Sequence, residues 1–188
     1  MAHENSLKMI PSFDQILVTA VATYSLELLK AVKNLNVAYV PIGLGSGICG
    51  MVAVRDALKL KTKIVGVVSA HASSYAESFT SRRPVESPVN TKIADGMACR
   101  VPEQSALEII WKGVERIVQV SDEEIAEAMR ILHECTHNVF EGSGAAAYAA
   151  AMQESSRIKG CKVAVIASGG NIDREVYAAV LNGETFAA

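Results

Sequence analysis

The chain has 188 residues, of which half are apolar and a fifth are charged, with a formal net charge of −2. This length fits one domain or a large part of a bigger one, and the apolar half is enough for a sizeable core. Acidic and basic residues are interspersed, which argues against a nucleic-acid-binding patch or a polybasic membrane-binding segment.

The cysteines and the amino-terminal residues bear on the cellular compartment. Cys49, Cys99, Cys135 and Cys161 are far apart and form no Cys-x-x-Cys pair, so we expect reduced, buried thiols. Residues 1–13 hold no apolar core of signal-peptide length, and no run of about 18 apolar residues occurs in the chain. These features predict a soluble cytoplasmic protein.

Apolar segments alternate with segments of helical periodicity along the chain. In order, they are a short apolar run at 15–21, a helix at 23–32, a strand at 37–42, a helix ending near Lys59, a strand at 63–69, a short helix at 71–79, a loop at 81–90, a helix at 102–114, a strand at 116–121, a helix from Ser121, a helix at 143–155, a strand at 162–168 and a helix at 172–181. This alternation predicts an α/β fold in which flanking helices cover a mostly parallel sheet. No linker divides residues 1–188, so we expect a single unit.

Several polar residues stand where helices are expected to begin. Ser121 and Glu124 have the spacing of a capping box, in which each side chain bonds the other residue's backbone N–H. Ser143 is expected to cap the alanine-rich helix. Asn171 and Asp173 are sufficiently explained as caps of the last helix.

Two glycine-rich turns follow expected strands, GLGSG at 43–47 and SGGN at 168–171. In an open parallel sheet, ligands bind at the carboxyl ends of the strands, where such turns lie. A helix that begins there offers free N–H groups to a phosphate, and glycines let the backbone approach it closely. Both turns are equally compatible with ordinary tight strand-to-helix connections. The first is neither a Walker loop nor a dinucleotide fingerprint, because the required residues and spacing are missing.

The segment HECTH, residues 133–137, matches the His-Glu-x-x-His pattern of zinc proteases. On a helical wheel the two histidines flank the apolar stripe of their helix, whereas Glu134 points away from it. No third ligand follows at the usual spacing. We therefore interpret HECTH as a half-exposed helix surface. Asp95 and Glu141 stand beside glycines, and each alone is compatible with a turn or cap residue.

Five stretches together resemble a known family. They are PIGLGSGICG, TKIADGMA, VSDEEIAEAM, FEGSGAAA and VIASGGNIDRE, in this order and spacing. They are similar to the serine/threonine dehydratases, or threonine ammonia-lyases, which belong with the serine racemases to the fold type II, tryptophan synthase β-like pyridoxal-phosphate enzymes. The similarity runs from about Met9 to Gly183. It implies part of the large domain of that fold, a parallel sheet with flanking helices.

The resemblance also implies which residues face pyridoxal 5'-phosphate. They are Gly43, Leu44, Gly45 and Ser46 around the phosphate, Ala94, Asp95 and Gly96 beside the cofactor, Glu141 on the pyridine side, and Ser168 with Gly169 at the pyridine nitrogen. A neutral serine there leaves the nitrogen largely unprotonated, which favours β-elimination over transamination. If this assignment is right, Ser168 and the backbone of 43–46 should border one shared hollow.

Two departures from the family pattern matter for ligands and packing. Family members often bind a divalent cation through acids in a segment that here carries Ala70, His71 and Ser73, so we predict no metal there. A glycine often found before the first helix is replaced by Ala20.

A further departure concerns the catalytic lysine. In the family it lies in a Ser-x-Lys stretch of an amino-terminal portion that also carries a Gly-Asn-His segment. We assign none of the lysines, such as Lys8, Lys30, Lys63, Lys92 and Lys162, to that stretch. We therefore expect a carboxy-terminal portion of a dehydratase domain with no catalytic residue of its own.

Two hypotheses for the function remain open. In the first, the chain is an inert part of an enzyme that eliminates water from L-threonine or L-serine to give a 2-oxo acid and ammonia, and needs a complementing amino-terminal fragment. In the second, it is a non-catalytic, self-associating module with at most a residual phosphate site, since an unpaired strand edge invites pairing. The expected protein partner is either further copies of the chain, in a homo-oligomer, or a complementing amino-terminal fragment, and the oligomeric state is left open. Neither serine against threonine preference nor racemase activity is specified by the sequence.

Overall fold

A parallel sheet of four strands forms the centre of the computed structural model, which describes residues 11–184 and 186. The strands are β1 (Val37–Pro41), β2 (Lys63–Ser69), β3 (Arg116–Val120) and β4 (Val163–Val165), in the spatial order β3-β2-β1-β4. In the register of the sheet, Tyr39 of β1 lies opposite Val65 of β2 and Val165 of β4. The predicted α/β class with a parallel sheet is confirmed.

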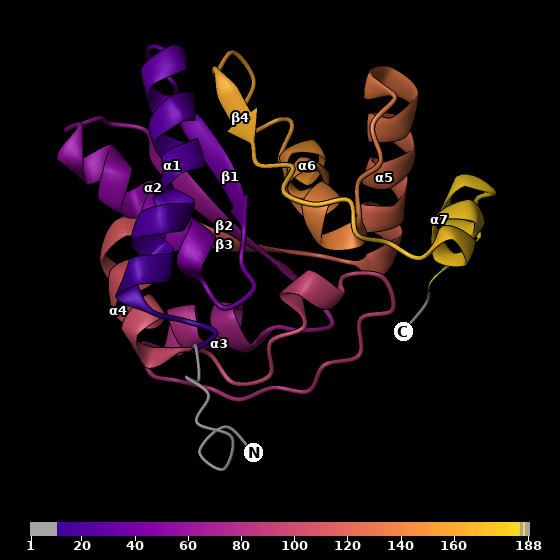
Figure 1. Ribbon diagram of the computed structural model, residues 1–188, viewed down its shortest axis with the longest axis horizontal. Coiled ribbons are helices and arrows are strands. Elements are labelled where there is room, and N and C mark those ends of the chain that lie inside the picture. The colour runs from indigo at the N-terminus through magenta and orange to yellow at the C-terminus, as the bar shows by residue number, and fades with distance from the viewer. Residues whose placement is uncertain (1–10, 185, 187–188) are drawn as a thin grey trace, which may run out of the picture.

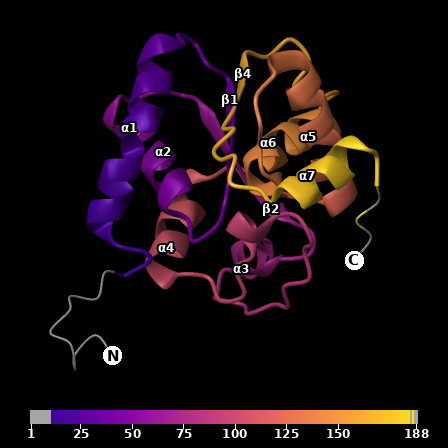
Figure 2. The ribbon, with the colours of Figure 1, turned by 45° about the vertical axis from the view of Figure 1, so that its right-hand side comes forward.

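Helices cover both faces of this sheet (Figures 1 and 2). They are α1 (Gln15–Ala31), α2 (Ser46–Ala57), α3 (Ser74–Ser81), α4 (Gln104–Gly113), α5 (Asp122–Thr136), α6 (Gly142–Gln153) and α7 (Arg174–Leu181), with a 3₁₀ turn, η1, at Asp95–Met97. Helices α1, α2 and α4 pack into one apolar core, and α5, α6 and α7 pack into a second. The sheet separates the two cores.

The strand residues alternate between these cores, as the pleat of a strand requires. Ala38 and Val40 belong to the core under α1 and α2, whereas Tyr39 between them belongs to the core under α6. Helix α6 is rich in alanine, and Ala145 and Ala149 are buried in that core. Their small side chains let the helix backbone lie close to the strands.

The first helix is longer than expected. The apolar run 15–21 is the first half of α1, not a separate segment. Asp14 begins the helix, because its side chain accepts a 2.7 Å hydrogen bond from the Ile16 N–H. Val18 and Leu29 lie on the buried side of the same helix, and this long-range periodicity makes one continuous element.

Two local expectations at helix starts had different outcomes. The capping box of α5 is confirmed: Ser121 accepts from the Glu124 N–H, and the Glu124 carboxylate accepts from the Ser121 N–H. Ser143 does not cap α6, because the chain turns helical two residues earlier and Glu141 occupies the N-cap position. Asp173 precedes α7 but makes no capping hydrogen bond through its side chain.

The cysteines are only partly buried. Cys49 and Cys99 are buried free thiols, as expected, but Cys135 and Cys161 are exposed. The expectation was wrong for these two because they lie at the end of α5 and in the connection before β4. No helix in the described part of the chain is long and apolar enough to cross a bilayer. The signal-peptide argument rests mainly on residues 1–10, which lie outside the described residues.

Candidate functional site

The turn between β1 and α2 presents backbone N–H groups at the carboxyl end of the sheet. Gly45 adopts a left-handed conformation, with φ of 97°, and the first hydrogen bond of α2 runs from the Cys49 N–H to the Gly45 carbonyl over 3.0 Å. The N–H groups of Ser46, Gly47 and Ile48 therefore precede the hydrogen-bond ladder of the helix. Ser46 and Gly47 are half-buried, so these donors are accessible to an anion.

Two tyrosines hold this turn in place. The Tyr75 hydroxyl donates to the Leu44 carbonyl over 2.7 Å and accepts from the Glu103 N–H over 3.0 Å. The Tyr24 hydroxyl donates to the Gly47 carbonyl over 3.0 Å. Burial raises the pKa of both phenols, so each remains a neutral donor at physiological pH. The turn is thus fixed by side chains from α1 and α3.

The glycines of this turn are required by the packing of the protein itself. A Cβ atom on Gly43 would lie 2.4 Å from the carbonyl oxygen of Gly96, and one on Gly45 would lie 2.9 Å from the Cβ of Ala106. The turn is therefore pressed against η1 and α4. A ligand is not needed to explain these glycines, but the same contacts bring the turn beside the Asp95-Gly96 stretch.

Glu141 joins that stretch to the second glycine-rich turn. Its N–H donates to the Gly169 carbonyl over 3.0 Å, and a Cβ atom on Gly169 would lie 2.4 Å from its Oε1. A Cβ atom on Gly96 would lie 2.9 Å from the Oγ of Ser143. Contacts thus run from Gly43 through Gly96 and Glu141 to Gly169, so four segments that are distant in sequence meet at one end of the sheet.

A cavity of about 200 Å³ opens between these segments. Asp95, Gly96 and Glu141 line it together with Ser143, whose buried Oγ makes no hydrogen bond to another described residue. Lys92, Asn171 and Asp173 are further polar lining residues. Ser143 was missed as a site residue, because its place near a helix start suggested only a cap.

The assigned residues do not all border this cavity. Ala94 is buried beside it, whereas Ser168 is exposed and is not part of its lining, and neither are residues 43–46. The two turns therefore do not share this particular cavity. The segments at Gly96 and Glu141 lie between them and connect them.

The histidines of HECTH have separate structural roles. The ring of His133 packs edge-on against Tyr177 of α7, with centroids 5.7 Å apart, and His137 ends α5 in a left-handed conformation. Within residues 11–184 and 186, no three His, Cys, Asp or Glu side chains are grouped as metal ligands.

Known proteins share both the sequence pattern and the fold of this chain. The family model described as pyridoxal-phosphate dependent enzyme matches residues 1–169. A catabolic L-threonine dehydratase of Staphylococcus aureus is 31% identical over 177 residues, which are 92% of this chain and 51% of the relative. An L-threonine ammonia-lyase of Thermotoga maritima is 31% identical over 172 residues, covering 92% and 43%.

Solved structures of similar enzymes share the fold of this chain. The processed form of threonine deaminase isoform 2 from Solanum lycopersicum superposes with a TM-score of 0.89 at 28% identity, over 96% of this chain and 51% of that one. The chain spans about half the length of the curated relatives it matches. The match over residues 1–169 includes the first turn, η1, Glu141 and Ser168. By this match, the chain belongs to the family of pyridoxal-phosphate-dependent enzymes.

Proposed function

We propose that this chain provides the phosphate-binding turn and the pyridine-facing residues of a pyridoxal-phosphate site of the threonine/serine dehydratase type. The observation that carries the proposal is the line of contacts from Gly43 through Gly96 and Glu141 to Gly169, which unites the segments that the family resemblance assigns to the cofactor. The cofactor itself is implied by the family match. When bound, pyridoxal phosphate supplies an electron-withdrawing ring that activates the Cα of an amino acid.

The first turn of α2 fits the phosphate of the cofactor. Ser46 and Gly47 are accessible, and their N–H groups stand at the positive end of a 12-residue helix. Leu44, which is 37% exposed, lies at the surface of the same turn. Because Tyr75 and Tyr24 bond the turn's carbonyl groups, its amides are held in one orientation before an anion arrives.

The remaining assigned residues would orient the ring. The hydroxyl of Ser168 is exposed and free to donate to a pyridine nitrogen, which a neutral partner leaves largely unprotonated. Glu141, with Asp95 and Gly96 across the cavity, would border the ring on its other edge. Ala94 and Gly169 add backbone contacts without side-chain bulk.

By itself the chain is proposed to turn over neither L-threonine nor L-serine. None of its lysines is assigned to the covalent anchoring of the cofactor, and a complementing polypeptide would supply that group. One triplet, Ser6-Leu7-Lys8, does have the Ser-x-Lys spacing, and it lies outside the described residues. Together, the two polypeptides would release a 2-oxo acid and ammonia by β-elimination.

A titration with pyridoxal phosphate tests this proposal. We expect saturable binding that inorganic phosphate competes away, with no ammonia released from L-threonine or L-serine. Borohydride reduction followed by peptide mass spectrometry should find no lysine adduct. Turnover together with an adduct on Lys8 or another lysine would contradict the inactivity of the isolated chain, and absence of binding would contradict the site.

A second candidate is a non-catalytic module that associates with itself. Strand β4 pairs with β1 on one side, and no other described strand pairs with its other side. Its residues Val163–Val165 are only half-buried, which leaves an edge open to pairing. Sedimentation equilibrium of the wild type and of Val165→Pro distinguishes this candidate: the Ile166 N–H bonds the Tyr39 carbonyl of β1, so the alternate N–H of Val165 faces the open edge. A dimer that the substitution disperses, together with no cofactor binding, would favour it over the first.

A further inference from the structure

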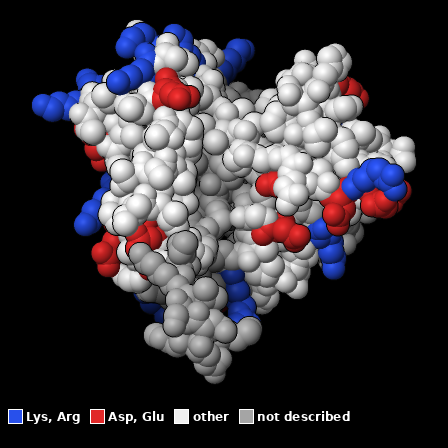
Figure 3. All heavy atoms as spheres, in the orientation of Figure 1, with Lys and Arg blue, Asp and Glu red and all other residues white. Residues whose placement is uncertain are grey.

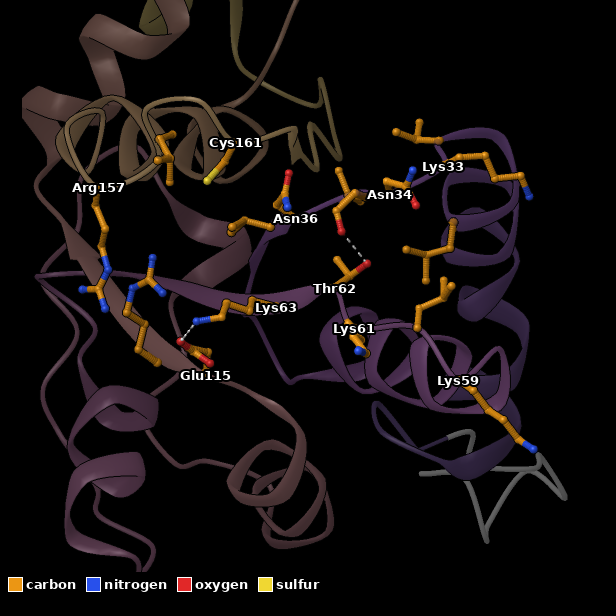
Figure 4. Close-up of a pocket in the computed structure, with 17 residues that line it drawn as sticks. Lys33, Asn34, Asn36, Lys59, Lys61, Thr62, Lys63, Glu115, Arg157 and Cys161 are labelled. Atoms are coloured by element: carbon orange, nitrogen blue, oxygen red, sulfur yellow. Dashed lines mark hydrogen bonds and ion pairs between the residues drawn. The ribbon is translucent and has the colours of Figure 1, made fainter.

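A second and larger cavity, of about 650 Å³, lies at the amino-terminal ends of the strands (Figure 4). Val37, Lys63 and Arg116, the first residues of β1, β2 and β3, contribute to its lining. It is therefore at the opposite edge of the sheet from the glycine-rich turns. Its volume is within the range of about 300 to 1,000 Å³ that is typical of small-molecule sites.

This cavity concentrates positive charge. Its charged lining residues are Lys33, Lys59, Lys61, Lys63, Arg116 and Arg157, with Glu115 as the one acid among them. The chain as a whole has 18 basic and 20 acidic residues, so a third of its bases surround one hollow. Figure 3 shows Lys and Arg side chains gathered at the top of the molecule, over the end of α1. Such a cleft attracts anions.

The local carboxylates do not neutralise this charge. Lys63 pairs with Glu115 over 2.7 Å, and Arg116 forms a closer pair with Glu154. Arg157 lies 3.5 Å from the same Glu154 carboxylate. Three cations thus share two carboxylates, and the three remaining lysines add to the excess.

The positions of the side chains indicate which cations face a ligand. Lys63 and Arg157 reach toward the same wall, beside Glu115, whereas Lys33 and Lys59 extend outward (Figure 4). The Arg157 side chain is 60% exposed and that of Lys63 is 59% exposed, so both are accessible to an incoming anion. Lys61 also lines the cavity.

The other walls are apolar. Leu60, which is 37% exposed, offers apolar surface to the cavity, whereas Leu29 and Leu35 are only 3% and 6% exposed and add little accessible area. Ile158 adds an apolar surface from the segment after α6. A ligand that fills this cavity must therefore combine anionic and apolar parts.

We propose that this cavity binds an organic phosphate. Its phosphate group is held by Lys61, Lys63 and Arg157, and its apolar body packs against Leu60 and Ile158. The site is separate from the cofactor turn and does not depend on cofactor binding. It is formed by residues of this chain at the amino-terminal ends of the strands.

The test uses the full chain and 1-naphthyl phosphate as the probe, with inorganic phosphate and 1-naphthol as its two halves. By calorimetry, the probe should bind at least about tenfold more tightly than either half, because both kinds of wall are engaged. Backbone amide shifts in ¹⁵N spectra should be concentrated at residues 59–64 and 157–162. Equal binding of inorganic phosphate, or shifts confined to residues 43–48, would overturn the proposal.

Matched variants distinguish binding at specific residues of the cavity from non-specific electrostatic attraction of the probe to the protein surface. The double variant Lys61→Gln/Arg157→Gln should weaken binding about tenfold or more, whereas Lys61→Arg/Arg157→Lys should stay within about twofold. Arg83→Gln, in the loop after α3, removes one exposed charge elsewhere and should leave the affinity unchanged. Circular dichroism checks that each variant is folded. An unchanged affinity in the Gln double variant would refute the site, and cofactor binding at the other end of the sheet is unaffected by either outcome.

Discussion

The hydroxyl of Tyr39 donates a 2.6 Å hydrogen bond to the Oε2 atom of Glu154, which ties the centre of β1 to the end of α6. Arg116, the first residue of β3, donates to the same carboxylate through its Nε over 2.9 Å. Tyr39 is fully buried, and the side chain of Glu154 is 14% exposed. One carboxylate therefore connects two strands and a helix on the α6 face of the sheet.

Replacing Tyr39 with phenylalanine tests the contribution of this hydrogen bond. The ring and its packing are kept, but a buried carboxylate loses a donor, and hydrogen bonds to charged groups are worth about 1.5 to 3 kcal/mol. We expect the free energy of unfolding in urea to fall by about 2 kcal/mol. Tyr177→Phe is the control, since the Tyr177 hydroxyl has no hydrogen-bond partner among the described residues. An equal effect of both substitutions would contradict the role of the bond.

The same carboxylate predicts a pH dependence of stability. Burial alone would raise the pKa of Glu154, but the hydrogen bonds from Arg116 and Tyr39 outweigh it and lower the pKa from its ordinary 4.5. The stabilisation is therefore fully present above the ordinary value and is lost as the pH falls through the lower folded-state pKa. In urea titrations from pH 7 to 3, the difference between the wild type and Glu154→Gln should shrink in acid. A constant difference would refute this assignment.

Glycines at the two ends of the site should differ in their tolerance of alanine. A Cβ atom on Gly142 would lie 2.0 Å from the Ile93 carbonyl oxygen, so backbone must move, and we expect Gly142→Ala to lower the free energy of unfolding by about 2 kcal/mol or more. At Gly47 the nearest atom, the Tyr24 hydroxyl oxygen, is 3.3 Å away, and alanine is the better helix former. Gly47→Ala should stay within about 1 kcal/mol of the wild type. Similar melting curves for both variants would argue against the close contact at Gly142.

The cysteines should react in two classes. Cys135 and Cys161 are exposed, whereas burial raises the pKa of Cys49 to about 12 and also raises that of Cys99. Because the thiolate is the reactive form, an aromatic disulfide reagent should modify Cys135 and Cys161 rapidly in the folded protein. Cys49 and Cys99 should react only as the chain unfolds. Rapid modification of Cys49, identified by peptide mass spectrometry, would contradict the packing of α2.

Local features were the most predictable from the sequence. The capping box at Ser121 involves residues three apart, and the strand at β1 alternates between two apolar cores, so both follow from short patterns. The run 15–21 was too short to distinguish a strand from half a helix. The role of Ser143 depends on Gly96, which is distant in sequence and packs against it.

The charge distribution shows the same limit on a larger scale. Basic residues that are interspersed along the chain, among them Lys33, Lys61 and Arg157, come from separate segments that the parallel sheet brings to one edge. The sequence argument considered only neighbours along the chain and did not identify this cluster of bases; the absence of a nucleic-acid or membrane partner stays a prediction. The family motifs, in contrast, indicated the correct cofactor class. They did not indicate that the cavity beside Glu141 is lined by neither Ser168 nor residues 43–46.

The most direct test of the cofactor assignment is a map of backbone amide shifts on titration with pyridoxal phosphate. We predict that the largest shifts occur at residues 43–48, with a second group at 168–169, and that inorganic phosphate reproduces the first group alone. Shifts that leave residues 43–48 unmoved, or that occur instead at 59–64 and 157–162, would contradict the assignment of the cofactor to the carboxyl end of the sheet.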